Sequence, residues 1–346
     1  MGLEFLRDHG AQRMRDDIMG PLLLDNDYEQ SNVQETEQCL EYELPTEKWR
    51  ALPVNHVSIP AEWSLGPQRF IDGKDLGRTV AWLQTEEWYP IPVRLSEIGA
   101  VIIQNVEGRL RREWYTVERV VSMIIDPFPW YEIESFAIAL QEENLRLLPC
   151  RKPQGRLTYD FQEMRKATQN RTLDEMMRLE KRALVHACDT PVLIDGRLES
   201  RYGGFDELLT PVVGMIKGHH RDYLHKEGWR VYYNLRCGER TPAFLLKQKN
   251  VDVVSWYVRI DGTGSDLPNW GIVRLEIPAK FFEKLGKDWE YINRISYLVC
   301  EYRCRDKSYE RASVSLYPIQ RAEESLGSLF TGADKFIQHF YKLIQL

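Results

Sequence analysis

The chain has 346 residues, of which 43% are hydrophobic, and its formal net charge is −6. With 10 Trp and 17 Tyr it has enough apolar material for one large core or two modest ones, which argues against a disordered or fibrous protein. The acidic balance argues against a protein that coats nucleic acid by its overall charge, and it suits a carboxylate-rich site for a divalent cation.

The N-terminal segment, residues 1–60, is predicted to be a helical arm followed by a linker. Its apolar residues from Phe5 to Leu24 are spaced to line one face of a short helix, and residues 25–37 are polar and acidic. The segment has no apolar stretch suited to a secretory signal, and no run in the chain approaches a membrane span. The six cysteines are scattered, as in proteins of a reducing compartment. We therefore expect a cytoplasmic protein with no membrane partner.

Residues 61–346 are predicted to form one α/β domain that opens with an antiparallel meander. The strand signals are short apolar or alternating segments, and Glu107-Gly108 is a turn signal. Because these segments follow one another without an intervening helix, the pattern favours a meander over a βαβ unit. The predicted strands cover residues 69–72, 79–83, 90–95, 99–106, 109–115 and 117–125.

The apolar period then changes to that of a helix. Thr172 and Glu175 have the spacing of a capping box within the second of two predicted helices. Helices are predicted over 130–148, 160–187, 280–285 and 336–346, and strands over 191–195, 211–217, 229–235, 251–260 and 271–277. Residues 295–302 and 313–317 are compatible with either strand or helix.

Two Asp-Gly dipeptides each follow an apolar strand. In Asp72-Gly73 and Asp195-Gly196 a carboxylate leaves the core at a predicted strand end, and the glycine lets the backbone turn closely beside it. Two such strand ends side by side would bring two carboxylates within reach of one hard divalent cation. The alternative is ordinary, because Asp-Gly is a common turn dipeptide. The pair gains weight from the helix between them, which carries a third candidate ligand.

That third candidate is Glu180, which has apolar neighbours on the predicted helix 160–187. The alternative is an exposed glutamate paired with a nearby lysine or arginine. Lys217 ends the apolar strand 211–217 and could contact a phosphate as a point charge, or it could be an ordinary surface lysine.

The order of these parts resembles the NurA family of nucleases. The family pattern is a strand with Asp-Gly, a helix glutamate, a second Asp-Gly strand, a Gly-x-x-Lys strand and a late Tyr-Pro-x-x-x-Ala segment. The matching segments here are Asp72-Gly73-Lys74, Glu180, Ile194-Asp195-Gly196-Arg197-Leu198, Gly214-Met215-Ile216-Lys217 and Tyr317-Pro318-Ile319-Gln320-Arg321-Ala322. The resemblance extends from about residue 67 to the end. Two positions depart from the pattern: Lys74 replaces a small Ser, and Glu323 stands where many members have His.

The resemblance implies an RNase H-like fold related to Piwi domains: a mixed sheet with an antiparallel meander, flanked by helices and preceded by an N-terminal extension. It implies Mn²⁺- or Mg²⁺-dependent cleavage of DNA, with single-strand endonuclease and 5′-to-3′ exonuclease activity in DNA repair, end resection or phage defence. It also implies a homodimer with a central channel, docked on a hexameric HerA-type ATPase.

On this basis we expect a two-metal site that hydrolyses phosphodiester bonds. Asp72 would bridge both ions, Asp195 and Glu180 would each hold one side, Glu323 would complete the shell, and Lys217 would steady a phosphate. A single strand would contact a basic and aromatic group of residues, namely Arg197, Arg201 and Tyr202.

Two other hypotheses follow from the same residues. Lys74 and Glu323 are compatible with a catalytically weakened RNase H-like scaffold or DNA-binding subunit of a translocase complex. A Piwi-like, guide-dependent nuclease is a third hypothesis, but the chain is short and shows no module to anchor a guide end.

Overall fold

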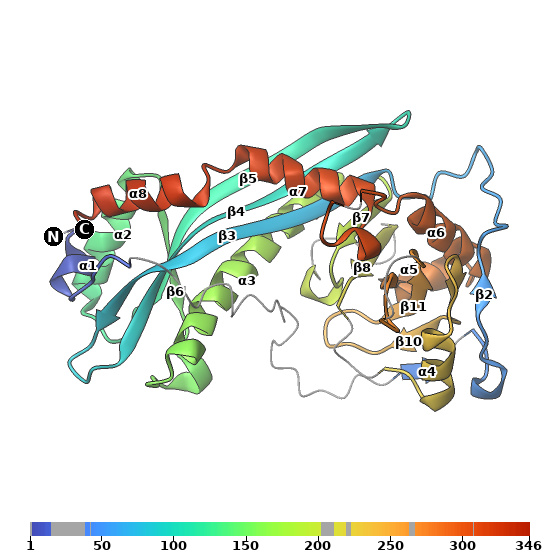
Figure 1. Ribbon diagram of the computed structural model, residues 1–346, viewed down its shortest axis with the longest axis horizontal. Helices are drawn as coiled ribbons and strands as arrows, with labels where there is room; N and C mark the ends of the chain where they lie inside the picture. Colours follow the sequence, from blue (N-terminus) through green and yellow to red (C-terminus); the bar gives the residue numbers. More distant parts are fainter. Residues whose placement is uncertain are drawn as a thin grey trace.

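The computed structural model describes residues 2–14, 39–41, 43–201, 211–218, 223–262, 267–306 and 308–346. Within these ranges twelve strands form one mixed sheet that helices flank (Figure 1). The strands are β1 (Cys39–Glu41), β2 (Leu52–Pro53), β3 (Arg69–Gln84), β4 (Pro90–Val106), β5 (Arg109–Ile124), β6 (Arg146–Cys150), β7 (Val192–Asp195), β8 (Val212–Ile216), β9 (Glu239–Arg240), β10 (Phe244–Leu246), β11 (Val253–Arg259) and β12 (Ile272–Pro278). The α-helices are α1 (Phe5–Asp8), α2 (Trp130–Glu142), α3 (Phe161–Ala187), α4 (Lys226–Tyr233), α5 (Ala279–Lys284), α6 (Trp289–Glu301), α7 (Tyr317–Leu329) and α8 (Ala333–Leu343). The predicted mixed α/β class is therefore confirmed.

The meander consists of β3, β4 and β5, three strands much longer than the sequence suggested. The prediction of two separate strands over residues 69–72 and 79–83 is wrong, because β3 runs unbroken through both segments. Asp72 and Gly73 stay in the ladder, paired with residues of β4, so this Asp-Gly is not a strand end. The predicted turn at Glu107-Gly108 is confirmed, with φ of 51° and 78° at its two residues.

The centre of the sheet has the strand order β5-β4-β3-β7-β8. After the antiparallel meander, the chain crosses through α3 and returns as β7, which is parallel to β3, and β8 is parallel to β7. A parallel pair requires such a crossover connection, which the long helix supplies. Figure 1 shows α3 along one face of the meander and α7 with α8 along the other.

Alternation along β3 divides its side chains between these two faces. Phe70 packs in the core cluster that contains Leu326 of α7, whereas Ile71 packs in the cluster that contains Leu179 and Ala183 of α3. The alternation continues, so Asp72 belongs to the α7 face and Gly73 to the α3 face. This division decides which residues of the two helices can reach Asp72.

The described helices correct several sequence predictions. Helix α3 begins at Phe161 because the Asp160 carboxylate accepts hydrogen bonds from the next turn. Thr172 therefore lies in the helix interior, and the predicted capping box is wrong. The prediction of one helix over 130–148 is also wrong, because α2 ends at Glu142 and β6 follows. Of the ambiguous segment 295–302, residues 295–301 belong to α6, and the predicted amphipathic C-terminal helix is confirmed as α8.

The prediction of a strand over 229–235 is wrong because α4 occupies most of it. His225 caps this helix, accepting a 2.9 Å hydrogen bond from the backbone N–H of Gly228 at its Nδ1. Tyr232 is buried against Tyr257 of the sheet. The Trp, Tyr and Val residues here favour strands, but capping and packing outweigh that preference.

Part of the predicted N-terminal arm joins the sheet. Strand β1 pairs with β10 and β2 pairs with β9. Between β1 and β2, Glu43 accepts two 2.7 Å hydrogen bonds from the buried guanidinium of Arg240. A domain boundary at residue 60 stays a prediction, and the predicted helix over 5–24 lies largely outside the described residues. No described helix is long and apolar enough to cross a membrane.

Candidate metal centre

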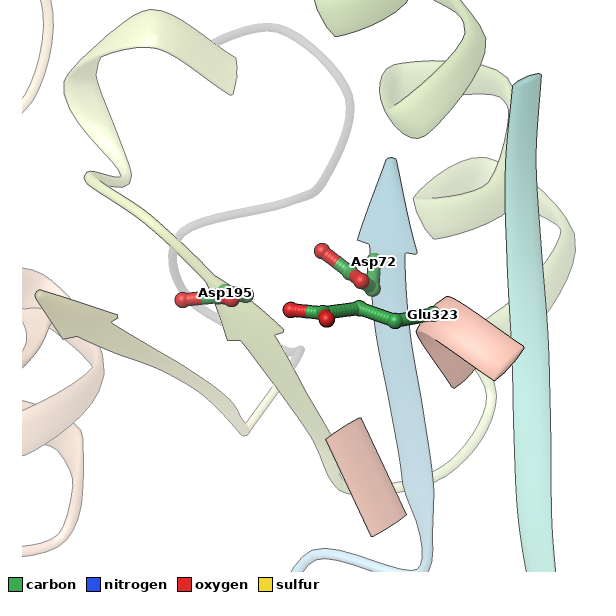
Figure 2. A group of neighbouring side chains, drawn as sticks. All are labelled: Asp72, Asp195 and Glu323. Atoms are coloured by element: carbon green, nitrogen blue, oxygen red, sulfur yellow. The ribbon is translucent and has the colours of Figure 1, made fainter. Parts of the chain in front are cut away.

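Three carboxylates from distant parts of the chain converge on the α7 face of the sheet. One oxygen of each of Asp72, Asp195 and Glu323 lies within 4.8 Å of the others. Figure 2 shows Asp72 reaching out from β3, Asp195 from the end of β7, and Glu323 from α7. The structure therefore brings together three of the four metal ligands that the sequence predicted. Their role as ligands stays a prediction.

The convergence follows from where two parallel strands part. Strands β3 and β7 pair only as far as Ile71 and Ile194. Asp72 and Asp195 are the next residues, so both carboxylates lie just beyond the end of the β3–β7 pairing, at the same level and on the same face. Asp195 does end its strand, as predicted, whereas Asp72 is an internal residue of β3.

The packing of helix α7 against the sheet places Glu323 at the site. Ile319, Ala322 and Leu326 are buried in the core under the helix. Glu323 follows Ala322 at the edge of this stripe and is half-buried. The helix begins at Tyr317-Pro318, where proline suits the first turn because its missing N–H would have no partner there.

Asp72 lies in a setting that disfavours an unaccompanied charge. Its side chain is buried, at 5% exposure, and its Oδ2 has no hydrogen-bond partner among the described residues. Burial is the main cause that raises the pKa of Asp72 well above its ordinary value, and the Asp195 carboxylate adds to the effect. A buried carboxylate oxygen without a partner is costly unless a cation or donor reaches it.

Lys217 brings a positive charge into contact with two of the three carboxylates. Its Nζ lies 2.7 Å from Asp195 Oδ2 and 3.9 Å from Glu323 Oε1. Burial alone would lower the pKa of Lys217, but the carboxylates of Asp195, Asp72 and Glu323 outweigh burial and raise it. The lysine that was predicted to contact a phosphate therefore lies among the three carboxylates.

Glu180, the other predicted ligand, approaches from the opposite face of β3. It is buried, at 1% exposure, on α3. A Cβ on Gly73 would lie 2.9 Å from both Cδ and Oε1 of Glu180, so the carboxylate lies directly against the glycine backbone. It lies outside the 4.8 Å group but close enough to add to the raised pKa of Asp72. Glycine is needed here for a close approach, not for the turn that the sequence suggested.

We expect Gly73→Ala to weaken Mn²⁺ binding about tenfold, because the new methyl group must displace the Glu180 carboxylate and loss of such support commonly costs roughly 10- to 100-fold in metal affinity. Titration calorimetry with Mn²⁺ measures the change. The matched control is Gly327→Ala on α7, where the new Cβ would meet only Lys74 Nζ at 3.6 Å. Equal Mn²⁺ affinities of Gly73→Ala and the wild type would show that Glu180 has no part in the site.

The loop after Asp195 is held by a buried ion pair. Gly196, with φ of 122°, donates a 2.7 Å hydrogen bond to Met215 O. The Leu198 N–H donates to Glu276 Oε1 at 2.6 Å. The other oxygen of Glu276 lies 3.0 Å from the buried Arg274 guanidinium. This pair anchors the chain directly beyond the carboxylate of β7.

The predicted single-strand contacts are only partly placed. Arg197 lies in this loop and forms a 3.2 Å ion pair with Glu199. The side chain of Arg201 and the whole of Tyr202 lie outside the described residues. The predicted nucleic-acid-binding role of all three stays untested.

Tyr309 is a neighbour of the site that sequence reasoning missed. It lies in the segment between α6 and α7, and its hydroxyl is buried. Burial, followed by interaction with Glu323, raises the pKa of Tyr309, and Asp72 contributes in the same direction. No sequence signal points to it, because no element or spacing connects this tyrosine to the two Asp-Gly dipeptides.

The donor set fits a hard divalent cation. It consists of carboxylate oxygens, which Mg²⁺ and Mn²⁺ prefer, and it includes the partnerless buried oxygen of Asp72. Of the described residues, these three form the group of metal-ligating side chains close enough to share an ion.

Comparisons with known proteins found similarity at the level of structure. No protein-family model matches the chain, and no curated protein matches it. The crystal structure of the NurA nuclease from Sulfolobus solfataricus is similar over 82% of this chain and 84% of that chain, with a TM-score of 0.43 and 11% sequence identity.

Proposed function

We propose that this chain is a divalent-metal-dependent nuclease. Its metal site, formed by Asp72, Asp195 and Glu323, would hydrolyse phosphodiester bonds. One observation carries the proposal: these carboxylates converge where the parallel strands of an RNase H-like sheet part, and the buried Asp72 Oδ2 there lacks a partner among the described residues. Buried polar atoms in folded proteins usually have a hydrogen-bond partner, and a buried carboxylate oxygen without one, close to two further carboxylates, is what an empty cation site would leave.

In this proposal the cofactor is Mn²⁺ or Mg²⁺, held in a two-ion site. Bound cations would supply an activated water and neutralise charge on the leaving oxygen. Asp72 would contribute its partnerless oxygen between the ions, and Asp195 and Glu323 would hold the side toward α7. Glu180 would support the side toward α3, across Gly73. Lys217 would turn from Asp195 to a substrate phosphate.

The broader biology is proposed from the family resemblance alone. The substrate would be DNA, as single strands or duplex ends, cut by single-strand endonuclease and 5′-to-3′ exonuclease activity. The protein would work in the cytoplasm as a homodimer with a HerA-type hexameric ATPase, in DNA end processing, repair or phage defence.

A cleavage assay tests the proposal. End-labelled single-stranded DNA, duplex DNA and RNA of one sequence are incubated with the chain in Mn²⁺, in Mg²⁺ and in EDTA. We expect DNA cleavage with either metal and none in EDTA. Glu323→Gln should lower the rate, whereas Glu324→Gln, which removes an exposed carboxylate paired with Arg321 on the same helix, should not. Cleavage that persists in EDTA would refute a metal-dependent nuclease.

The competing hypothesis is a catalytically weakened scaffold, and the position of Lys217 favours it. Its ammonium already lies among the carboxylates, where a cation would bind. A scaffold predicts no Mn²⁺ binding that depends on Asp72, whereas a nuclease predicts displacement of the lysine by metal. Calorimetry with the wild type and Asp72→Asn separates the two.

Lys217→Met is expected to lower the free energy of unfolding of the metal-free protein by about 3 kcal/mol, because breaking a buried ion pair leaves uncompensated charge. Mn²⁺ should restore most of that loss, so its stabilising effect should be larger than for the wild type. Urea unfolding with and without Mn²⁺ measures both values. The exposed Lys284→Met on α5 is the control. Identical Mn²⁺ gains in Lys217→Met and the wild type would contradict this role.

A further inference from the structure

The segment between α6 and α7 is closed at its base by backbone hydrogen bonds. The Tyr317 N–H donates to Tyr302 O at 2.7 Å, and the Cys304 N–H donates to Ser315 O at 2.8 Å. Arg303 and Leu316 form an isolated antiparallel bridge between them. The two arms of this segment therefore hold a fixed spacing at the start of the helix that carries Glu323.

The tip of the segment is tied to α7 itself through Gln320. Asp306 accepts a 3.2 Å hydrogen bond from Gln320 Nε2, and Gln320 Oε1 accepts a 3.1 Å hydrogen bond from Cys304 Sγ. Asp306 also accepts hydrogen bonds from the N–H and hydroxyl of Ser308, at 2.9 and 2.6 Å. Gln320 precedes Glu323 by about one helical turn, so this network and Glu323 share one rigid element.

This network places the Tyr309 hydroxyl close to the three carboxylates. The Tyr309 N–H donates to Asp306 O at 3.1 Å, and its carbonyl accepts from the Ala312 N–H at 3.0 Å, which fixes the backbone. The ring is half-buried and its hydroxyl is fully buried. The Glu323 carboxylate and the Ser315 hydroxyl are the side-chain groups that interact with it, but neither completes a hydrogen bond of standard geometry with it in the metal-free structure. A buried hydroxyl without a hydrogen bond lowers the stability of the folded protein, and a hydrogen-bond acceptor in the site would remove this cost.

We infer that Tyr309 is a positioning residue of the metal centre, whose hydroxyl donates a hydrogen bond to the Glu323 carboxylate and aims it at the cation shared with Asp72 and Asp195. The inference rests on the proposed function, because it assumes that the carboxylates bind metal. Ligating carboxylates are commonly oriented by such donors. A glutamate side chain is flexible, so a hydrogen bond that holds it in its ligating conformation would stabilise the metal-bound state.

The test is a double-mutant cycle on Mn²⁺ affinity, measured by calorimetry without substrate. Tyr309→Phe should raise the dissociation constant about tenfold, as expected for loss of a donor to a ligand. In a Glu323→Ala background the same change should have no further effect, because its target is gone. The control Tyr317→Phe removes an exposed hydroxyl from the first turn of α7 and should leave the affinity unchanged. The thermal midpoint of metal-free Tyr309→Phe should be at least as high as that of the wild type, because the hydroxyl that is removed has no hydrogen bond there.

An unchanged affinity of Tyr309→Phe would overturn the inference, and so would an equal loss in both backgrounds of the cycle. The proposed function is judged separately by Asp72→Asn. If Asp72→Asn binds Mn²⁺ as the wild type does, the proposed metal site itself is wrong. If Asp72→Asn loses Mn²⁺ and Tyr309→Phe does not, only the positioning role falls.

Discussion

Asp72→Asn is expected to reduce Mn²⁺-dependent DNA cleavage by about 1000-fold or more, equivalent to roughly 4 kcal/mol of transition-state stabilisation. The reason is that one oxygen of Asp72 lies within 4.8 Å of oxygens of Asp195 and Glu323, and that its buried Oδ2 has no partner among the described residues. The amide keeps the shape of the side chain but removes the charge that a divalent cation requires. Initial rates on labelled single-stranded DNA measure the effect.

The control for this variant must separate lost chemistry from lost folding. Because burial disfavours a charged Asp72 and raises its pKa, the neutral amide should leave the metal-free protein at least as stable as the wild type. Loss of cleavage with retained stability would therefore point to the metal site. A variant that cleaves at the wild-type rate would remove Asp72 from the mechanism.

Arg274→Met is expected to lower the free energy of unfolding by about 3–5 kcal/mol, because it leaves a buried carboxylate without its cation. Glu276, which is fully buried, would keep, among the described residues, the hydrogen bond from the Leu198 N–H alone. That bond holds the loop that follows Asp195, so Mn²⁺ affinity should fall as well. Urea unfolding measures the first effect and calorimetry the second.

A surface ion pair provides the comparison for Arg274. Arg321 pairs with Glu324 on the exposed side of α7, and exposed pairs contribute about 0–1 kcal/mol. Arg321→Met should therefore change stability far less than Arg274→Met. Similar losses in the two variants would mean that the Arg274–Glu276 pair is not a special anchor of the site.

The sequence predicted the elements of the domain better than their lengths. The meander, the α3 crossover and the strands of both Asp-Gly dipeptides were readable because their apolar residues keep a clear period. The unbroken course of β3 through Asp72-Gly73 was not, because local turn preference favours a break there. Pairing with the neighbouring strand β4 overrides that preference, and no single-sequence signal records it.

The site was readable in part for a related reason. Asp195 and Asp72 were found because each follows an apolar strand, and Glu323 was found through the resemblance of the Tyr317-Pro318 segment. Tyr309 was missed because its place depends on Asp306 and Gln320, a network formed only in three dimensions. The sequence also could not predict that Glu323 and Glu180 approach β3 from opposite faces, because this depends on how α7 and α3 pack on the sheet.

The most direct test of the central claim is anomalous diffraction from crystals of the chain grown with Mn²⁺. The account predicts an anomalous peak bound by Asp72, Asp195 and Glu323, with Mn²⁺–oxygen distances of about 2.0–2.4 Å, as hard divalent cations require. Lys217 should have moved away from Asp195. Manganese absent from these carboxylates at saturating concentration, with Lys217 still 2.7 Å from Asp195, would contradict the account.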